Sequence, residues 1–284
     1  MSAPNLRKSA KIGIVYIARG GSGGIESIQR FRETYDSCDA GIAHSLYIVA
    51  KRWETEDEIR NVEECFGDIA TKILFLPDDG FDLGAYIRVA QNVPSEWLCF
   101  LNTHSRILRA NWLFMLYDGA KDDGVGAAGA TGSWESAFNA LLHAAWPTGL
   151  SSRLRRAATL IGNWVKFPAF PNPHLRTNAF MTRTDVFVDF ASGIDFPRTK
   201  RDVYAIESGS NSFSSYIRGR GLDLRVCGAD GAVYSIEDWP LSGTYRSSDQ
   251  CNLLVADNQT LEFSLADARL RKSLQLEAWG VSLE

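Results

Sequence analysis

The sequence predicts an α/β fold in which a mostly parallel β-sheet is flanked by helices. Short apolar runs rich in β-branched residues alternate with segments of helical periodicity, and the connections between them are short, which is the pattern of βαβ units. The length of 284 residues allows one large domain of this kind. Because no internal repeat or low-complexity linker interrupts the chain, we expect one continuous domain.

The first half of the chain carries the regular part of this pattern. Predicted strands cover residues 11–18, 45–50, 72–76 and 97–101. Predicted helices follow the first three of them at 25–35, 54–66 and 82–92. In the first of these helices the spacing of Ile28 and Phe31 predicts an inward face.

The second half is less regular. Predicted strands cover residues 125–130, 178–182 and 224–227, and predicted helices cover 136–165, 208–218 and 261–279, with a proline-rich connection at 167–173.

Composition and charge narrow the classes of function. With 30 basic and 34 acidic residues the formal net charge is -4, so no global field favours nucleic acid and a phosphate-bearing ligand needs a local site. The five cysteines are scattered and form no CxxC pair, which argues against a zinc site or a disulfide framework and fits a reducing cytoplasm. No signal-peptide pattern and no run near the roughly 20 apolar residues of a spanning helix is present. We expect a cytoplasmic protein that at most lies against a membrane.

A glycine cluster follows the first predicted strand. Ala18 and Arg19 lead into Gly20, Gly21 and two further glycines, where backbone N–H groups and a helix start can approach a phosphate. The spacing matches neither the GxGxxG fingerprint nor a P-loop, so a plain flexible turn is an equal alternative. Position favours a ligand, because the carboxyl ends of parallel strands form the crevice of an open sheet.

Two more polar segments follow predicted strands. Asp78, Asp79 and Asp82 follow the third strand, where they can hold a ribose, a base or a metal, although Asp82 can equally cap the helix after it. Asn102 and His104 follow the fourth strand and, two residues apart on an extended segment, point the same way. A structural histidine is the alternative for His104.

The order of these motifs resembles the GT-A type of glycosyltransferase, especially the inverting family 2. The segments that carry the resemblance span residues 12–226 and are Gly80-Phe81-Asp82-Leu83-Gly84, Leu101-Asn102-Thr103-His104, Val125-Gly126-Ala127-Ala128-Gly129, Arg176-Thr177-Asn178-Ala179-Phe180-Met181 and Glu207-Ser208 leading to Arg220-Gly221. The resemblance implies a GT-A-like domain at 1–235, with a nucleotide-sugar half at about 10–105 and an acceptor half at about 106–235. Residues 236–284 are expected to form a loop and a helix packed on the same domain.

The resemblance also implies roles for single residues. The expected donor-binding residues are Ala18, Arg19, Gly20, Gly21, Asp79, Asp82, Asn102 and His104. The expected acceptor or diphosphate residues are Arg176, Asn178, Arg246 and Asp249, the last two on a polar loop that has a solvated surface loop as its alternative. Glu207 is the expected catalytic base, because inverting sugar transfer needs a group that takes the proton of the acceptor hydroxyl. A helix cap is the alternative role for Glu207.

Three positions depart from the family pattern. Asn102 and His104 stand where an Asp-x-Asp element usually holds Mn²⁺ or Mg²⁺, which leaves His104 as the candidate metal ligand and predicts a weak or absent metal requirement. Lys51 or Arg52 stands where the family usually has an acidic residue that contacts the nucleobase of the donor. Glu207 is followed by Ser208, where the family has a second acidic residue.

A basic helix interrupts the second half. Arg153, Arg155 and Arg156 lie among apolar residues that include Trp146 and Trp164. Such a helix can lie on an anionic membrane surface, and packing against the domain is its alternative.

We therefore expect a transferase that moves a sugar from a nucleoside-diphosphate donor to a glycan or lipid-linked acceptor, with inversion, in the synthesis of a bacterial surface polysaccharide. The alternative is a GT-A-like carbohydrate-binding or scaffold protein without catalysis. A nucleotidyltransferase is less favoured, because no basic signature loop follows the first strand.

Overall fold

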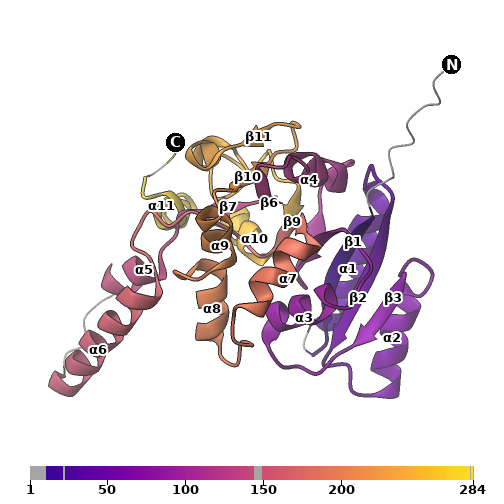
Figure 1. Cartoon of the computed structure of the whole chain (residues 1–284), viewed down its shortest axis with the longest axis horizontal. Coiled ribbons are helices and arrows are strands. Elements are labelled where there is room, and N and C mark those ends of the chain that lie inside the picture. Colours follow the sequence, from indigo (N-terminus) through magenta and orange to yellow (C-terminus); the bar gives the residue numbers. More distant parts are fainter. Residues whose placement is uncertain (1–10, 22, 144–148, 282, 284) are drawn as a thin grey trace.

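The computed structural model describes residues 11–21, 23–143, 149–281 and 283. Within these residues the chain forms an eight-stranded sheet of order β11-β10-β6-β9-β4-β1-β2-β3 (Figure 1). Its strands are β1 (Ile12–Arg19), β2 (His44–Lys51), β3 (Lys72–Phe75), β4 (Trp97–Leu101), β6 (Val125–Gly129), β9 (Ala179–Arg183), β10 (Asp223–Cys227) and β11 (Val233–Tyr234). Neighbouring strands are parallel except that β9 is antiparallel to β4 and β6, and β11 to β10.

Helices cover both faces of this sheet. The helices of the described residues are α1 (Gly24–Ser37), α2 (Glu56–Phe66), α3 (Phe81–Ala90), α4 (Trp112–Ala120), α5 (Ala137–His143), α6 (Leu150–Lys166), α7 (Thr184–Ser192), α8 (Lys200–Ser208), α9 (Phe213–Gly219), the 3-10 helix η1 (Ile236–Leu241), α10 (Asn258–Leu265) and α11 (Ala268–Trp279). Two small pairings join β5 (Arg106–Ile107) to β12 (Val255–Ala256) and β7 (Gly132–Ser133) to β8 (His174–Leu175). The predicted α/β fold with a mostly parallel sheet between helices is confirmed.

The apolar character of β1 follows from burial on both sides. Ile14 and Tyr16 belong to the core under α1 and α2, whereas Val15 and Ile17 belong to the core under α3 and α7. Since side chains of a strand alternate between the two faces, a strand covered on both faces reads as a continuous apolar run.

Two predicted helices are divided by residues that end one helix and cap the next. Residues 208–218 are not one helix, because α8 ends at Ser208 and Ser212 caps α9 by accepting a hydrogen bond from the Ser215 N–H at 3.2 Å. Likewise residues 261–279 contain the end of α10 and all of α11, whose cap is Asp267.

Residues 236–281 contain more structure than the predicted loop and helix. They contain η1, β12, α10 and α11, and β12 pairs with β5, the short strand that follows β4. Trp279 anchors the end of α11, since its indole is buried and donates to the Tyr245 carbonyl at 3.0 Å.

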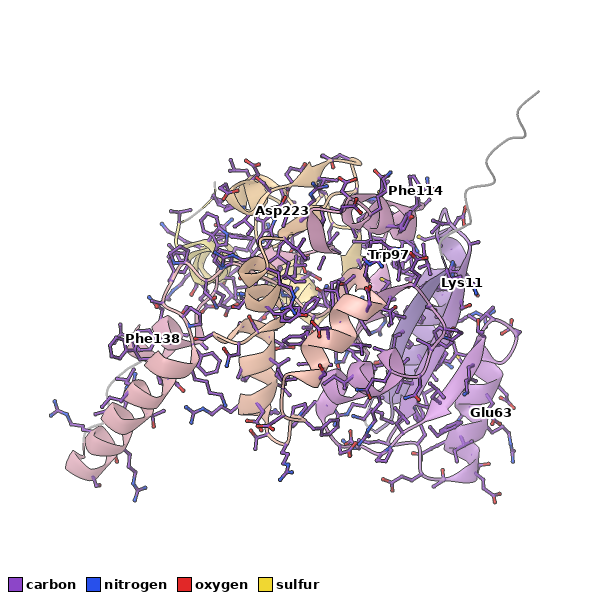
Figure 2. The ribbon with its side chains drawn as sticks, viewed as in Figure 1. Lys11, Glu63, Trp97, Phe114, Phe138 and Asp223 are labelled. Carbon is purple, nitrogen blue, oxygen red and sulfur yellow. The ribbon has the colours of Figure 1, made fainter. Side chains whose placement is uncertain are left out.

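The helices α5 and α6 form an arm that stands away from the sheet (Figure 1). Phe138 lies on α5 near the base of the arm, and the long side chains of α6 extend outward from it (Figure 2). Among the described residues, no helix is both long and apolar enough to cross a membrane.

Candidate active site

A cavity of about 630 Å³ opens beside the carboxyl ends of the central strands. Asn102 lines it directly after β4, and Asn178 lines it directly before β9. Because β9 is antiparallel to β4, its amino end meets the carboxyl end of β4, where Leu101 pairs with Ala179. Asp82 on α3 and Glu207 on α8 also line the cavity. Four residues from separate predicted motifs are thus brought together.

Glu207 lies in the last turn of α8, with its carboxylate held from the neighbouring strand connection. The Thr177 hydroxyl donates to Glu207 Oε1 at 2.5 Å. Burial raises the pKa of the Glu207 carboxyl, and the negative charge of Asp82 acts in the same direction, against Thr177 and Arg176. The alternative role as cap of a helix at 208–218 is wrong, because that helix does not exist and Ser212 caps α9.

Asp82 sits in the first turn of α3 but does not cap it. The cap position is Gly80, which has a left-handed backbone (φ 64°) and makes no side-chain capping bond. Burial raises the pKa of the Asp82 carboxyl, opposed by the positive charges of Lys51 and Arg19 and by His104. Asp82 therefore interacts electrostatically both with these cations and with the Glu207 carboxyl.

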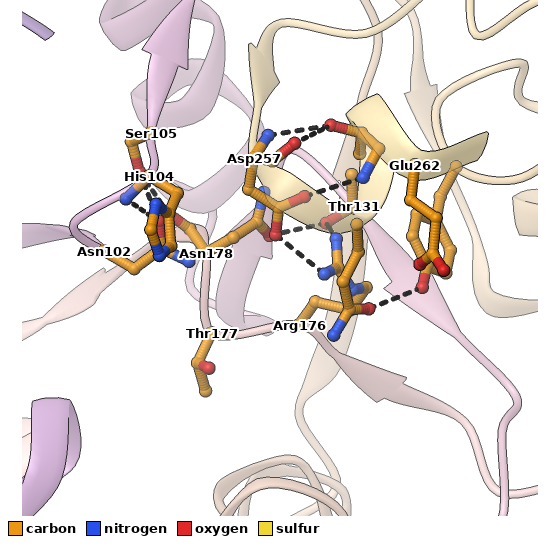
Figure 3. A network of polar contacts seen from close by, with 12 residues as sticks. Asn102, His104, Ser105, Thr131, Arg176, Thr177, Asn178, Asp257 and Glu262 are labelled. Carbon is orange, nitrogen blue, oxygen red and sulfur yellow. Dashed lines mark hydrogen bonds and ion pairs between the residues drawn. The ribbon is translucent and has the colours of Figure 1, made fainter. Parts of the chain in front are cut away.

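Arg176 forms a buried ion pair with Asp257 at one wall of the cavity (Figure 3). The distance from Arg176 Nη2 to Asp257 Oδ2 is 2.7 Å, and the guanidinium lies 4.2 Å from the centre of the Tyr245 ring. Burial alone would lower the pKa of Arg176, but the charge and hydrogen bond of Asp257 together with the effects of Tyr245 and Glu135 outweigh it, and the pKa is raised. Asp257 also caps α10 by accepting from the Thr260 N–H at 2.9 Å. Arg176 is consequently fixed in place and largely neutralised.

A chain of hydrogen bonds forms the floor between β4 and β9 (Figure 3). Asn102 Oδ1 accepts from the His104 N–H at 3.0 Å and from Ser105 Oγ at 3.1 Å. Ser105 Oγ also lies 3.0 Å from the Asn178 carbonyl, so its single proton is shared between the two acceptors. Asn178 Oδ1 accepts from the Thr131 hydroxyl at 2.7 Å. Asn178 Nδ2 is buried without a hydrogen-bond partner among the described residues, which leaves one amide donor of the floor unused.

The residues at the Asp-x-Asp position do not fit a divalent ion. Asn102 Oδ1 accepts from the His104 N–H and lies within reach of the Ser105 hydroxyl proton, so it is already engaged within its own turn, and a neutral amide is a weaker ligand for a divalent ion than the carboxylate it replaces. His104 is exposed and lines a separate small cavity beside Arg30. In the described part of the chain, no group of three or more His, Cys, Asp or Glu side chains is arranged to hold a metal.

Cations gather instead at the carboxyl ends of β1 and β2, around Asp78. This carboxylate lies 2.9 Å from Arg19, 3.5 Å from Lys51 and 3.6 Å from Arg52. The buried Lys51 ammonium also donates to the Asp79 carbonyl at 2.9 Å and to the Phe81 carbonyl at 2.7 Å, and burial lowers its pKa against the pull of Asp78. We call Arg19, Lys51 and Arg52 the basic cluster. Its three positive charges exceed the single negative charge of Asp78 by two.

The backbone beside the basic cluster belongs to the predicted glycine turn. Gly20 donates its N–H to the Lys51 carbonyl at 2.8 Å, and a Cβ there would lie 2.1 Å from the Arg52 carbonyl oxygen, so β1 and β2 need a glycine at this point. Gly21 has φ 98° and is exposed. The Ala18 carbonyl accepts from the Trp53 indole at 2.9 Å and is therefore occupied.

Three predicted site residues are not among the described residues that line this cavity. Asp79 pairs with Arg88 through both carboxylate oxygens at 2.5 and 2.6 Å. Arg246 is buried and pairs with Glu277 at 3.3 Å. Asp249 is exposed and pairs with Arg271 at 2.8 Å. The structure does not bring these side chains to Glu207.

Sequence reasoning did not find Asp257 or Thr177. Asp257 is followed three residues later by Thr260, which is a capping-box spacing that marks a helix start at Asn258. Thr177 lies between Arg176 and Asn178, and nothing in its local pattern distinguishes it from a structural threonine.

Comparison with known proteins gives no sequence family. No protein-family model and no curated protein sequence matches this chain. Among solved structures, the chain is similar to a mannosyltransferase from Pyrobaculum calidifontis in complex with GDP-Man and Mn²⁺, at 10% identity and a TM-score of 0.39 over 65% of this chain and 48% of that one. This chain thus spans about half the length of the mannosyltransferase.

Two other solved structures are similar over most of their length. One is CMP:2-keto-3-deoxy-manno-octonic acid synthetase complexed with CTP, at 15% identity and a TM-score of 0.44 over 76% of this chain and 89% of that one. The other is 4-diphosphocytidyl-2C-methyl-D-erythritol synthase from Anaerococcus prevotii, at 10% identity and a TM-score of 0.41 over 69% and 83%. Since all three TM-scores lie below 0.5, the activity of this chain has to be inferred from its own site.

Proposed function

We propose that this chain is a glycosyltransferase that moves a sugar from a nucleoside-diphosphate donor to a hydroxyl of a glycan or lipid-linked acceptor, with inversion. The observation that carries the proposal is the position of Glu207. Its carboxylate is held by Thr177 inside a cavity at the carboxyl ends of the strands, beside Asp82. A cavity of this size is within the range of small-molecule sites.

In the proposed reaction Glu207 acts as the general base. It takes the proton of the acceptor hydroxyl as that oxygen bonds to the anomeric carbon of the donor sugar. The bond from the anomeric carbon to the phosphate oxygen breaks, and the nucleoside diphosphate leaves with the bonding electrons. A carboxylate whose pKa is raised by burial is a stronger base than an exposed one, which favours this step near neutral pH.

The donor is proposed to bind with its diphosphate toward the basic cluster. Arg19 and Arg52 are partly exposed, with side-chain exposures of 31% and 51%, and can turn from Asp78 to a phosphate. Gly21 beside them allows close approach of the backbone. Since Asn102 and His104 do not fit a divalent ion, the proposed reaction contains no step through a metal. The guanidinium and ammonium groups of the basic cluster are proposed to neutralise the charge of the diphosphate.

The acceptor is proposed to occupy the cavity between Glu207, Arg176 and Asn178. The ion pair with Asp257 holds Arg176 in one orientation, so that it can position an acceptor hydroxyl without a large cost in side-chain entropy. The free amide donor of Asn178 suits an oxygen of the same acceptor.

A product assay tests the proposal against its two rivals. The protein is incubated with each common nucleotide-sugar and a panel of glycans, and release of nucleoside diphosphate is measured. Release that depends on the acceptor supports the proposal. Formation of pyrophosphate from a nucleoside triphosphate and a sugar phosphate would instead assign a nucleotidyltransferase. Glycan binding without either release would assign the carbohydrate-binding alternative.

A further inference from the structure

The α5–α6 arm has few polar contacts with the body of the molecule. Asn163 accepts from Arg201 at 2.7 Å, Lys166 pairs with Asp202 at 3.5 Å, and Asn139 accepts from the backbone of Phe170 at 3.0 Å. These contacts lie at the base of the arm, and most of α6 extends beyond them (Figure 1). Trp146, one of the predicted membrane-facing residues, lies outside the described residues.

One side of α6 exposes large apolar groups. Ile161 is 66% exposed and Trp164 is 69% exposed. With Ala157 they are spaced four and three residues apart, which places them on one face of a helix. Another side of α6 contacts α5, where Arg156 donates to the Leu141 carbonyl. The exposed apolar face is thus a property of the free side of the arm and not a packing surface of the body.

The charged side chains of α6 itself have a single sign. This helix contains Arg153, Arg155, Arg156 and Lys166 and no Asp or Glu, and Lys166, at its end, pairs with Asp202 of α8. Arg153 and Arg155 are exposed, and neither forms an ion pair within the described residues. An exposed tryptophan and isoleucine flanked by arginines are the groups that bind the interface of an anionic bilayer, because the rings enter the headgroup region while the cations attract the lipid phosphates.

We propose that the α5–α6 arm docks this protein on an anionic lipid bilayer, with Ile161 and Trp164 in the interface and Arg153, on the same face of α6, against the headgroups. This goes beyond the proposed transfer reaction and does not depend on it. The arm also forms part of the cavity wall, since Ala140 and Leu141 of α5 and Asn163 of α6 line the cavity of Glu207. Docking of the arm therefore holds the cavity that it lines near the membrane surface.

Vesicle binding by the full chain tests the proposal without any donor or acceptor. Co-sedimentation and the tryptophan emission maximum are compared for vesicles of phosphatidylcholine alone and vesicles with about 30% phosphatidylglycerol. The variants are Ile161→Ser with Trp164→Ser, and Arg153→Gln with Arg155→Gln. The matched control is Leu265→Ser, which replaces a side chain that is 77% exposed on α10. Far-UV circular dichroism and melting temperature check that each variant is folded.

We expect binding to the anionic vesicles that salt weakens and that each double variant reduces by at least about tenfold, with Leu265→Ser unchanged. Equal binding to both kinds of vesicle, absence of binding, or binding that the arm variants do not change overturns the proposal. A dimer in solution that the Ile161 and Trp164 substitutions dissociate also overturns it, because the face then belongs to a second copy of the chain. Loss of transfer activity has no effect on these readouts, so the two proposals fail separately.

Discussion

Replacing Glu207 by glutamine removes the proposed base and keeps its shape. The amide oxygen of glutamine can still accept the hydrogen bond from the Thr177 hydroxyl, so the last turn of α8 is expected to keep its geometry. Turnover is expected to fall by about 10²–10⁴, the usual contribution of a positioned general base. Donor affinity is expected to stay unchanged, because the basic cluster near Asp78 is untouched.

The thermal stability of Glu207→Gln provides a second, independent test. The folded-state pKa of Glu207 is raised, so the stability that this group contributes is present below its unfolded pKa and is lost as the pH rises through the folded pKa. A neutral glutamine does not carry that loss. The melting temperature of Glu207→Gln at neutral pH is therefore expected to equal or exceed that of the unchanged protein.

The assay measures initial rates of nucleoside-diphosphate release together with melting curves. Glu64→Gln, an exposed glutamate on α2, serves as the matched control and is expected to alter neither. In the unchanged protein the rate is expected to rise with pH through a pKa above the ordinary glutamate value, and this limb is expected to vanish in Glu207→Gln. Turnover close to normal in a folded Glu207→Gln would refute the assignment and leave Asp82 as the carboxylate to test.

The remaining predictions concern the groups around this base. Asp82→Asn removes a negative charge that raises the pKa of Glu207, so the acid limb of the pH–rate profile is expected to shift to lower pH; an unshifted limb would show that the two carboxyls do not interact. EDTA is expected to leave donor binding and turnover unchanged, and a loss that Mn²⁺ restores would contradict this. A nucleoside diphosphate in excess is expected to raise the melting temperature by mass action, and Arg52→Ala to reduce that shift; no shift with either protein would count against the donor site. Asp257→Ala is expected to lower the free energy of unfolding by about 3–5 kcal/mol in urea denaturation, because it leaves Arg176 buried and unpaired.

The pKa of Asp257 gives this last variant a pH dependence as well. Burial acts to raise the pKa of Asp257, but Arg176 and the Thr260 N–H outweigh it, so the pKa is lowered. The stability from this group is therefore present above its unfolded pKa and is lost as the pH falls through the folded pKa. The difference in stability between the protein and Asp257→Ala is expected to shrink on acidification.

The strands and the polar residues that follow them could be predicted from the sequence, because both depend on local patterns. A strand buried on both faces must be apolar throughout, as β1 is, and polar residues directly after it must lie at the sheet edge. Asn102 was placed in this way. Asn178 precedes its strand and reaches the same edge only because β9 runs antiparallel, which no local pattern states.

Side-chain partners could not be predicted, because they depend on residues far apart in the chain. Asp79 and Asp82 are only three residues apart, yet Asp79 pairs with Arg88 while Asp82 lines the cavity. Arg176 finds its carboxylate 81 residues away in Asp257. The local sequence allowed Glu207 to be a helix cap. The structure excludes this role because α8 continues past Glu207 to its C-cap at Gly209, and Ser212 caps α9.

The distribution of charge suggests how donor and acceptor are kept apart in the proposed reaction. The cavity contains the carboxylates of Asp82, Glu135 and Glu207, and among its described lining residues the guanidinium of Arg176 is already paired with Asp257. A diphosphate placed there would face net negative charge at short range, which is costly in a partly buried site. The basic cluster at the ends of β1 and β2 offers the opposite field, and Asp82 interacts with both regions. We infer that the diphosphate lies over the basic cluster and the donor sugar extends past Asp82, so that its anomeric carbon meets the acceptor hydroxyl at Glu207.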